Sequence, residues 1–501
     1  MNAPLRRVGV VAMVLFGLLF ANLNFVQWHK ANDYRTSQYN GRVQVAEYDR
    51  QRGVIEVSGK PGAQSNSTDD NLKFLRVYPY KAEFAHVIGY KPVNGEATGI
   101  EYIENEFLAG TSDQLFADRL RDLWSNEKTP GGNVVTTLSL RAQQTAYKEL
   151  LNNANNAKVG SVVALDPTTG AVLAMVSTPS YDPNVLVGHD TTAANRAYDR
   201  LAADPSQPLL NRAVKETYAP GSIFKVIDSA AALERGYTMN TSIPAGSSYT
   251  APGTTHAIKN AAPSICPEAQ VTLIEALTES CNTGFAQLGV ALGPQAITDT
   301  AEAFGFGDDS LRVGQLGKDN GILVAPSQVG RLTTDSGGPD QPIIAQTAIG
   351  QADARVTPMQ AALMAATVAN GGVQMQPYLI QQLLGPDRTT SYGIAAPHKL
   401  RDVCSSSVAQ SLQAMMVSVV ENGTGKKAQI DGYVVGGKTG TAQNAENAKD
   451  HGWFIGFAMK DGKPLVAVAV LLANAGSGGS GEAARIGGQV MKAVIADRGG
   501  K

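Results

Sequence analysis

The sequence has nearly balanced charge, few histidines and few cysteines. The charge balance and the histidine pattern each exclude a class of function. The formal net charge is -2 at pH 7 with a pI near 6.3, so the chain lacks the basic surface of a nucleic-acid-binding protein and any general attraction to anionic membranes. The 6 histidines show no metal-ligand spacing. Because the sequence also has no carboxylate pair or Walker loop, we expect neither a metal nor a nucleotide cofactor.

Long hydrophobic runs are also scarce, because the chain has only one, near its N-terminus. The uncharged residues 8–28 follow Arg6 and Arg7 and are long enough to span a bilayer. By the positive-inside rule, residues 1–7 are a cytoplasmic tail and the chain after Lys30 is exported. A cleaved signal peptide is the alternative, although the apolar stretch is longer than a usual signal core. We expect a single-pass membrane protein with an extracytoplasmic body.

The three cysteines are important because an exported chain meets oxidising conditions. Cys266 and Cys281 lie close in sequence and are a candidate disulfide, which would leave Cys404 unpaired. Connectivity cannot be deduced from sequence, so a bridge and two free thiols both stay open.

The composition, 43% hydrophobic and 17% charged, is that of a folded chain with two or three globular domains. Residues 30–150 are polar and mixed, and short alternating runs such as "GVIEVSG" indicate strands and loops. Near residue 151 the pattern of residue types changes. Two β-rich runs flank the turn sequence Asp166-Pro-Thr-Thr-Gly170, which predicts a hairpin at the start of the large domain.

Helical patterns dominate residues 222–425, for example "TPMQAALMAATVANGG", which ends in the Asn-Gly-Gly expected at a helix stop. Strand patterns return in "GWFIGFAMKDGKPLVAVAVLLAN", and a last helix is predicted near 482–496. Strands on both sides of a helical segment predict an α+β domain whose sheet contains both ends of the domain.

The stretch "YAPGSIFKV" places Ser222 after Pro-Gly and before an apolar run, which is typical of a helix start. On that helix Lys225 would share a face with Ser222, and the positive helix end would favour a developing alkoxide. Roughly two Ser-x-x-Lys matches are expected by chance in a chain of this length. One such match, Ser125 to Lys128, has no apolar helix behind it. The pattern alone therefore does not identify a nucleophile.

A second pattern, Ser280-Cys281-Asn282, puts a hydroxyl and a carboxamide two residues apart. On a loop between helices both side chains could face one cleft, where the serine would relay a proton and the amide would bind a substrate peptide group. A polar turn that merely interrupts a helix is the alternative. No histidine lies near Cys281 in sequence, so a structural or bridging role is expected for this thiol rather than a nucleophilic one.

The third pattern, Lys438-Thr439-Gly440, is more specific, because about 0.1 matches are expected by chance. On a strand, alternation puts Lys438 and Gly440 on one face, with a cation beside a position where no Cβ blocks a substrate. The alternative is a glycine turn with a solvated lysine.

Taken in order, the three patterns lie 58 and then 158 residues apart and resemble the motif set of penicillin-binding proteins and serine β-lactamases. The stretches "ALDPTTGAVLAMVSTPSYDPN" and "AIGQADARVTPMQAALMAATVANGG" resemble the transpeptidase domain. "QRGVI" and "GIEYIENEFLAG" resemble the pedestal of class B penicillin-binding proteins. The chain is most similar to the actinobacterial penicillin-binding protein A group, over nearly all its length after residue 40.

The resemblance implies a fold and a division of the chain. The fold is a penicillin-binding transpeptidase or serine β-lactamase-like domain, in which helices flank a central antiparallel sheet and an all-helical subdomain is attached. An elongated β-rich pedestal and one transmembrane helix precede it. The implied segments are a cytoplasmic tail (1–7), a transmembrane anchor (8–28), a pedestal (30–150) and a transpeptidase domain (151–501).

The resemblance also implies a role for each motif residue. Ser222 would be the nucleophile, Lys225 its base, Ser280 a proton relay, and Lys438 a neighbouring charge that helps to lower the pKa of Lys225. Asn282 would bind the substrate amide. The terminal carboxylate would lie along Lys438-Thr439-Gly440 and Thr441, with the two threonines as its ligands. The backbone N–H groups of Ser222 and Thr441 would form the oxyanion hole.

The implied function is a peptidoglycan D,D-transpeptidase of cell wall synthesis that releases D-alanine and is trapped by β-lactams. The alternatives are a D,D-carboxypeptidase, a membrane-anchored β-lactam sensor or β-lactamase, and a scaffold for a polymerase. The expected partners are stem peptides and a glycan polymerase of the SEDS membrane family, contacted through the anchor and pedestal. No nucleic-acid partner is expected.

Overall fold

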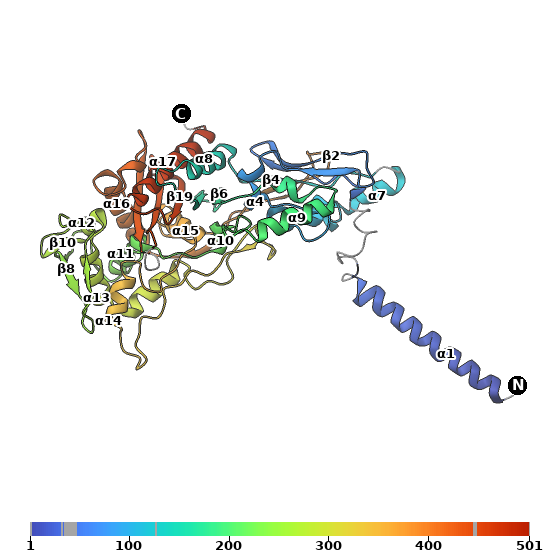
Figure 1. Ribbon diagram of the computed structural model, residues 1–501, viewed down its shortest axis with the longest axis horizontal. Helices are drawn as coiled ribbons and strands as arrows, with labels where there is room; N and C mark the ends of the chain where they lie inside the picture. Colours follow the sequence, from blue (N-terminus) through green and yellow to red (C-terminus); the bar gives the residue numbers. More distant parts are fainter. Residues whose placement is uncertain (1–2, 32–33, 35–47, 126–127, 444–447, 500–501) are drawn as a thin grey trace.

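The protein is an elongated body from whose pedestal end a long N-terminal helix projects (Figure 1). The computed structural model describes residues 3–31, 34, 48–125, 128–443 and 448–499. Residues 1–2 of the predicted tail, and residues 32–33 and 35–47 of the predicted pedestal, lie outside the described residues.

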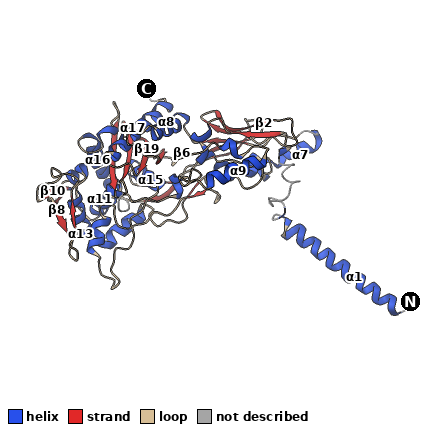
Figure 2. Ribbon diagram, in the orientation of Figure 1, coloured by secondary structure: helices blue, strands red, loops and turns tan. Residues whose placement is uncertain are grey.

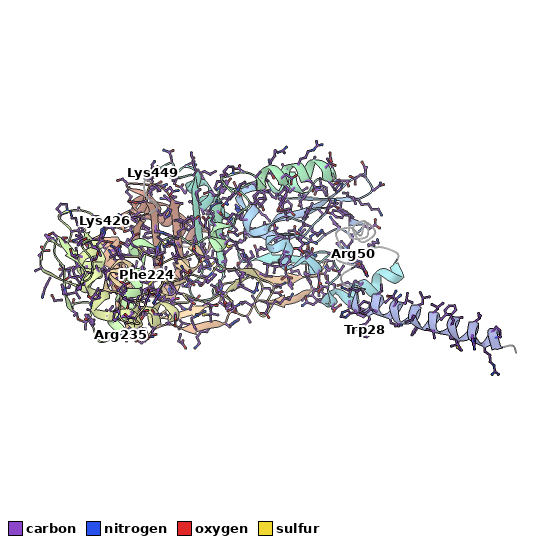
Figure 3. The ribbon with its side chains drawn as sticks, turned by 60° about the horizontal axis from the view of Figure 1, so that its bottom comes forward. Trp28, Arg50, Phe224, Arg235, Lys426 and Lys449 are labelled. Atoms are coloured by element: carbon purple, nitrogen blue, oxygen red, sulfur yellow. The ribbon has the colours of Figure 1, made fainter. Side chains whose placement is uncertain are left out.

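The N-terminal helix α1 covers Ala3–Asn24 and continues as a π-helical turn, η1, over Phe25–His29. Residues Arg6–His29 are long and apolar enough to cross a membrane, and none of this window is buried in the protein. Trp28, at the end of this segment nearest the body, is 92% exposed (Figure 3). The predicted apolar helix is therefore present as an element free of the body's core.

The large domain contains a five-stranded sheet in the order β17-β18-β19-β5-β6, with every neighbouring pair antiparallel. Its strands come from both ends of the large domain, as the sequence predicts. The β5–β6 pair is the predicted hairpin, whose turn is held by Asp166 Oδ1, which accepts from the backbone N–H of Thr168 at 2.8 Å. The strand bounds are β5 Val159–Leu165, β6 Val172–Thr178, β17 Val434–Ala442, β18 His451–Lys460 and β19 Lys463–Ala473.

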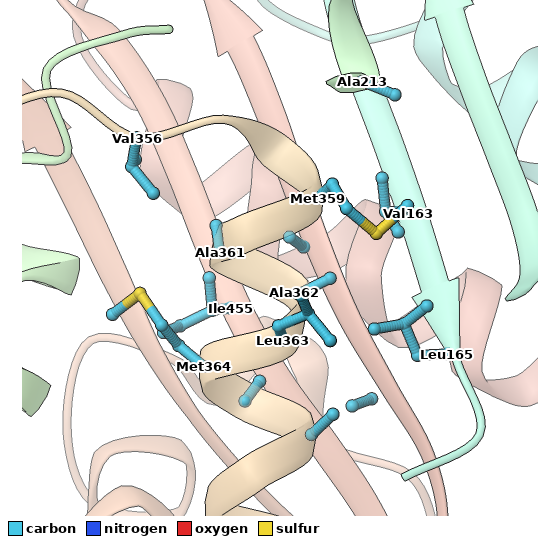
Figure 4. Close-up of a cluster of buried hydrophobic side chains, with 14 of the residues drawn as sticks. Val163, Leu165, Ala213, Val356, Met359, Ala361, Ala362, Leu363, Met364 and Ile455 are labelled. Atoms are coloured by element: carbon cyan, nitrogen blue, oxygen red, sulfur yellow. The ribbon is translucent and has the colours of Figure 1, made fainter. Parts of the chain in front are cut away.

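Helices cover both faces of this sheet (Figure 2). Along β19, Ala467 and Ala469 belong to the same hydrophobic cluster as helix α15 (Pro358–Ala369), whereas Val468 packs with α8 (Leu140–Leu151) and α17 (Gly479–Asp497). This alternation is the period-2 pattern of a strand buried on both sides. Figure 4 shows the buried helix α15 lying against the sheet.

The predicted helical subdomain lies beside β17. It carries two small two-stranded sheets, β7 with β10 and β8 with β9. Two further pairs, β11 with β12 and β13 with β16, lie against α10 (Arg212–Lys215) and α15, respectively. The helices of the subdomain are α11 Lys225–Glu234, α12 Leu273–Glu279, α13 Asn282–Ala303, α14 Gln341–Thr347 and α16 Ser406–Glu421, whereas α9 Thr191–Ala202 lies beside the pedestal (Figure 1). The strands are β7 Ser242–Pro244, β8 Ser248–Thr250, β9 Ala257–Lys259, β10 Gln270–Thr272, β11 Arg312–Val313, β12 Ile322–Leu323, β13 Val373–Met375 and β16 Lys399–Asp402.

The pedestal contains a six-stranded sheet in the order β15-β14-β4-β1-β2-β3. Two of its strands come from within the segment assigned to the transpeptidase domain, and α8, from the pedestal segment, packs on α17. The two parts therefore exchange elements rather than separating at residue 150. The strands are β1 Ile55–Val57, β2 Lys60–Ser67, β3 Phe74–Val77, β4 Asn133–Thr136, β14 Ile380–Leu384 and β15 Ser391–Ile394. The helices are α4 Ala85–Ile88, α5 Gly99–Ile103, α6 Asn105–Leu108 and α7 Phe116–Ser125.

A buried ion cluster ties the start of the pedestal to its helices. Glu101 accepts from Arg52 at 2.7 Å and from Arg76 at 2.6 Å, and all three side chains are buried. Burial raises the pKa of Glu101, but the two guanidinium charges outweigh it and lower the pKa overall. Removing one partner would leave an uncompensated buried charge, so the cluster fixes how this end packs.

Candidate active site

Ser222 lies in a tight turn that leads into α11. The 3-10 turn η5 covers Gly221–Ile223, and α11 begins at Lys225. Gly221 has φ +53°, a conformation that favours glycine, and its N–H donates to the carbonyl of Gly350 at 2.9 Å. Ser222 is half-buried, whereas Phe224 behind it is fully buried in the domain (Figure 3). The turn therefore presents the Ser222 hydroxyl from a backbone that is held by buried neighbours.

Two further glycines allow this turn to sit against its neighbours. A Cβ at Gly350 would lie 1.9 Å from the carbonyl oxygen of Gly221. A Cβ at Gly440 would lie 2.9 Å from the carbonyl oxygen of Pro220 and 3.0 Å from Ile223. The space at Gly440 is thus occupied by the turn η5, called below the nucleophile turn after the role predicted for Ser222, rather than being open to a substrate. This differs from the expectation drawn from strand alternation.

Lys225 is fully buried, and its amine faces the second motif. Its Nζ donates to the carbonyl oxygen of Ser280 at 2.9 Å, to Ser280 Oγ at 3.3 Å and to Asn282 Oδ1 at 2.8 Å. Ser222 is one helical turn before it. The amine of Lys225 therefore meets Ser280 and Asn282, which the chain supplies from the α12–α13 junction.

Ser280 joins the two motif lysines. It ends α12 in the left-handed conformation, with φ +64°. Its Oγ accepts from Lys438 Nζ at 2.9 Å, and the same amine donates to the carbonyl oxygen of Thr439 at 3.0 Å. One hydroxyl therefore lies within hydrogen-bonding distance of two buried amines, as a proton relay requires.

Burial changes the protonation of both amines. Burial lowers the pKa of Lys225 to about 7, although nearby Cys281 and Asp228 oppose the shift. The pKa of Lys438 lies well below its usual value, through burial first and the charge of Lys225 second. Burial is the larger cause for each amine, and repulsion between the two disfavours the state in which both are charged. Lys225 is consequently neutral for part of the time near pH 7, the state a base needs.

The Lys438-Thr439-Gly440 motif lies on β17, at the edge of the five-stranded sheet. Thr439 is buried, and its hydroxyl is 2.5 Å from that of Thr424, whereas Thr441 is exposed and donates to Ser480 Oγ at 3.3 Å. A Cβ at Gly221 would lie 2.4 Å from the carbonyl oxygen of Thr441, so this carbonyl faces the nucleophile turn. The N–H and C=O of one residue in an antiparallel strand point to the same side, so the Thr441 N–H does too.

Cys266 and Cys281 are buried, and both are free thiols. Coupling between their side chains raises the pKa of Cys266 and lowers that of Cys281. The thiols are therefore adjacent, but the disulfide stays a prediction. Cys404 is also free and half-buried.

The second Ser-x-x-Lys pattern lies in the pedestal. Ser125 ends α7, and Lys128 donates to Asp49 Oδ2 at 2.8 Å. Among the described residues, no group of three or more His, Cys, Asp or Glu side chains could hold a metal ion.

Sequence reasoning did not identify Thr424, Ser480 or Trp453 as parts of the site. Trp453, on β18, donates its Nε1–H to the carbonyl oxygen of Ala219 at 3.0 Å, directly before the nucleophile turn. None of these residues lies in a recognisable pattern, and each reaches the site only through sheet pairing or helix packing.

Comparison with known families decides which proteins share this arrangement. Residues 160–492 match the penicillin binding protein transpeptidase domain, and residues 52–134 match the penicillin binding protein A dimerisation domain. The chain belongs to the penicillin-binding protein transpeptidase family. The likeness to class B enzymes of the penicillin-binding protein A group is thereby confirmed, as is the predicted α+β fold.

Similar relatives extend over the whole chain. The peptidoglycan D,D-transpeptidase PbpA of Mycolicibacterium smegmatis is 40% identical over 99% of both chains, and that of Mycobacterium tuberculosis is 39% identical over 99% of both. The ceftriaxone acyl-enzyme complex of penicillin-binding protein A from M. tuberculosis has a TM-score of 0.83 and 38% identity, covering 90% of this chain and 100% of that one.

Proposed function

We propose that this protein is a peptidoglycan D,D-transpeptidase that cross-links stem peptides through an acyl-enzyme on Ser222. The observation that carries the proposal is the convergence on Ser280 Oγ of Lys438 Nζ at 2.9 Å and Lys225 Nζ at 3.3 Å, with Ser222 one turn before Lys225. Relatives named as D,D-transpeptidases, and the β-lactam acyl-enzyme complexes of similar structures, support it.

In the first half-reaction, Ser222 Oγ attacks the carbonyl between the last two D-alanines of a stem peptide. Neutral Lys225 takes the hydroxyl proton, and Ser280, placed between the two lysines, delivers a proton to the leaving amine. The amide bond breaks, an ester to Ser222 forms, and D-alanine leaves. In the second half-reaction the amine of another stem peptide attacks the ester, forms the cross-link and returns the proton to Ser222.

The substrate-binding groups are proposed from the same geometry. The backbone N–H groups of Ser222 and Thr441 would stabilise the developing oxyanion, because the Thr441 peptide faces the nucleophile turn. The exposed Thr441 hydroxyl would bind the terminal carboxylate. Thr439 is the weaker candidate, because its hydroxyl is already bonded to Thr424. Asn282 would bind the substrate amide if its side chain exchanges one of its present partners.

The setting of the enzyme is also part of the proposal. α1 would anchor the protein with its N-terminus in the cytoplasm, since Arg6 and Arg7 precede the apolar run. The anchor and pedestal would contact a SEDS-family glycan polymerase. β-Lactams would acylate Ser222, because they mimic the D-alanyl-D-alanine end.

Labelling by fluorescent penicillin tests the nucleophile. Full-length protein should form a stable adduct, Ser222→Ala should abolish it, and Ser125→Ala should retain it as the matched Ser-x-x-Lys control. Adduct formation by Ser222→Ala would refute the assignment.

A donor peptide with an added acceptor amine separates the alternatives. A transpeptidase releases D-alanine together with a cross-linked product, whereas release with hydrolysed donor alone identifies a carboxypeptidase. Rapid loss of the penicillin label identifies a β-lactamase. Wild-type walls and shape in a Ser222→Ala strain without redundant paralogues would favour the scaffold.

A further inference from the structure

The helix that carries Asn282 has no cap of its own. Its N-cap residue is Cys281, whose side chain makes no capping hydrogen bond. The first N–H groups of a helix have no partner within the helix and need one from elsewhere. Other helices of this domain obtain it locally, as α15 does from Thr357 and α16 from Ser405.

A residue 22 positions away supplies the cap of α13. Asn260 Oδ1 accepts from the backbone N–H of Asn282 at 2.8 Å and from that of Thr283 at 3.1 Å. Asn260 directly follows β9, in the hairpin formed with β8. The start of α13 is therefore held from outside the helix, at the residue that follows Cys281.

The amide nitrogen of the Asn260 side chain is also hydrogen-bonded. Its Nδ2 donates to the carbonyl oxygens of Gly246 at 3.1 Å and Ile265 at 2.8 Å. Thr283 Oγ1 donates to the carbonyl oxygen of Gly246 at 2.7 Å, closing the same network. One amide thus binds both sides of the hairpin segment to the first turn of α13.

This network fixes the amide of Asn282. With the backbone of Asn282 held by Asn260, its Nδ2 donates to the carbonyl oxygen of Lys259 at 2.9 Å, and its Oδ1 accepts from Lys225. The two contacts set which end of the amide faces the buried amine. The hairpin therefore decides the orientation of Asn282, and through Cys281 the position of Ser280.

We propose that Asn260 is the positioning residue that holds Ser280 and Asn282 against Lys225 for acyl transfer, an inference that rests on the proposed function. Without Asn260 the helix start and the hairpin would each lose partners, and the Ser280–Asn282 segment would sample other positions. Small displacements of catalytic groups lower reaction rates steeply.

The test compares Asn260→Ala, Asn260→Asp and a matched control, Asn133→Ala. Asn133 is a buried pedestal asparagine that accepts from Val54 N–H at 2.9 Å and donates to the Gly385 carbonyl at 2.7 Å. Rates of acylation by fluorescent penicillin are measured for the full-length proteins over a range of penicillin concentrations, well below each melting temperature.

We expect Asn260→Ala to lower the maximal acylation rate by about tenfold or more, and to affect it more than the half-saturating concentration. Asn260→Asp keeps the acceptor of the cap but loses the donors to Gly246 and Ile265, so it should recover part of that rate. Asn133→Ala should acylate as wild type does, even where its melting temperature falls equally.

Wild-type acylation by Asn260→Ala, or an equal loss in Asn133→Ala, would overturn the role of Asn260. Failure of Asn260→Asp to recover more than Asn260→Ala would also overturn it. A wild-type protein that takes no label on Ser222 would refute the proposed function instead, so the two failures are distinguishable.

Discussion

At the scale of single residues, the site depends on putting two lysine amines where water cannot solvate their charge. Lys225 and Lys438 are both fully buried, and the hydroxyl of Ser280 is the group they share. An exposed lysine is almost wholly protonated at neutral pH and cannot accept a proton. Burial therefore gives Lys225, the proposed base, the neutral form that a base needs.

The acylation rate should follow the protonation of Lys225. Because its pKa is lowered to about 7, the neutral amine increases as pH rises, and the rate should climb through about pH 7 and level off above pH 8. Stopped-flow acylation from pH 5.5 to 9 measures this profile. Lys225→Arg should acylate at least about a thousandfold more slowly, since a guanidinium does not deprotonate.

Exposed Lys148 on α8 provides the control, and Lys148→Arg should keep the wild-type profile. A rate that is flat from pH 5.5 to 9 would contradict the role of Lys225.

The lowered pKa of Lys225 also has a consequence for folding stability. Between about pH 7 and 10.5 the unfolded chain binds the extra proton, so this group makes stability rise with pH across that window.

The motif residues were predictable from sequence because their chemistry repeats at short spacing. Ser280 and Asn282 both contact Lys225, which follows Ser222 by three residues, and Ser280 also contacts Lys438. Asn260 was not predictable, because a helix N-terminus normally takes its cap from its own N-cap residue. A cap supplied across 22 residues leaves no local pattern to read.

At the scale of elements, the nucleophile turn η5 is wedged between β17 and the segment around Gly350. Gly440 admits it from one side and Gly350 from the other. The sequence places Gly440 on a strand correctly, but strand alternation cannot say which neighbour fills the space. Such close approaches arise only from the packing of distant segments.

A pair of alanine substitutions tests whether this wedge sets the position of Ser222. Gly350 and Gly462 have nearly the same φ, +74° and +73°. A Cβ at Gly462 would meet nothing within 4 Å, whereas a Cβ at Gly350 would lie 1.9 Å from the Gly221 carbonyl oxygen. Each substitution should lower the free energy of unfolding by about 1 kcal/mol through backbone strain. Only Gly350→Ala should also slow acylation, by about a hundredfold.

Thermal unfolding and fluorescent penicillin labelling measure the two effects separately. Equal labelling of both variants would show that Ser222 reacts even when η5 is displaced. The close approach at Gly350 would then contribute to packing alone.

At the scale of the whole molecule, the pedestal and the transpeptidase domain are one interleaved structure. β14 pairs with β4 in the pedestal sheet, and Asn133 Nδ2 donates to the Gly385 carbonyl at 2.7 Å. The pattern of residue types changes near residue 151, but it cannot show that the two parts share a sheet. Pairing between strands so far apart in the chain leaves no periodic signal.

Truncation should expose the interleaving. Residues 48–501 should fold, unfold in a single transition and bind penicillin. Residues 151–501 should aggregate or fail to label, because β14 and β15 lose the rest of their sheet and α17 loses α8. Size-exclusion chromatography and labelling decide the outcome, and a soluble 151–501 fragment with wild-type labelling would contradict it.

The shared sheet also sets the order in which the chain can fold. β1 to β4 emerge first, yet their sheet is completed only when β14 and β15 arrive, more than 240 residues later. Until then the β4 edge offers unpaired backbone groups to any other strand. The pedestal sheet thus stays open until β15 has emerged, and its waiting β4 edge is where a chaperone of the growing chain would act.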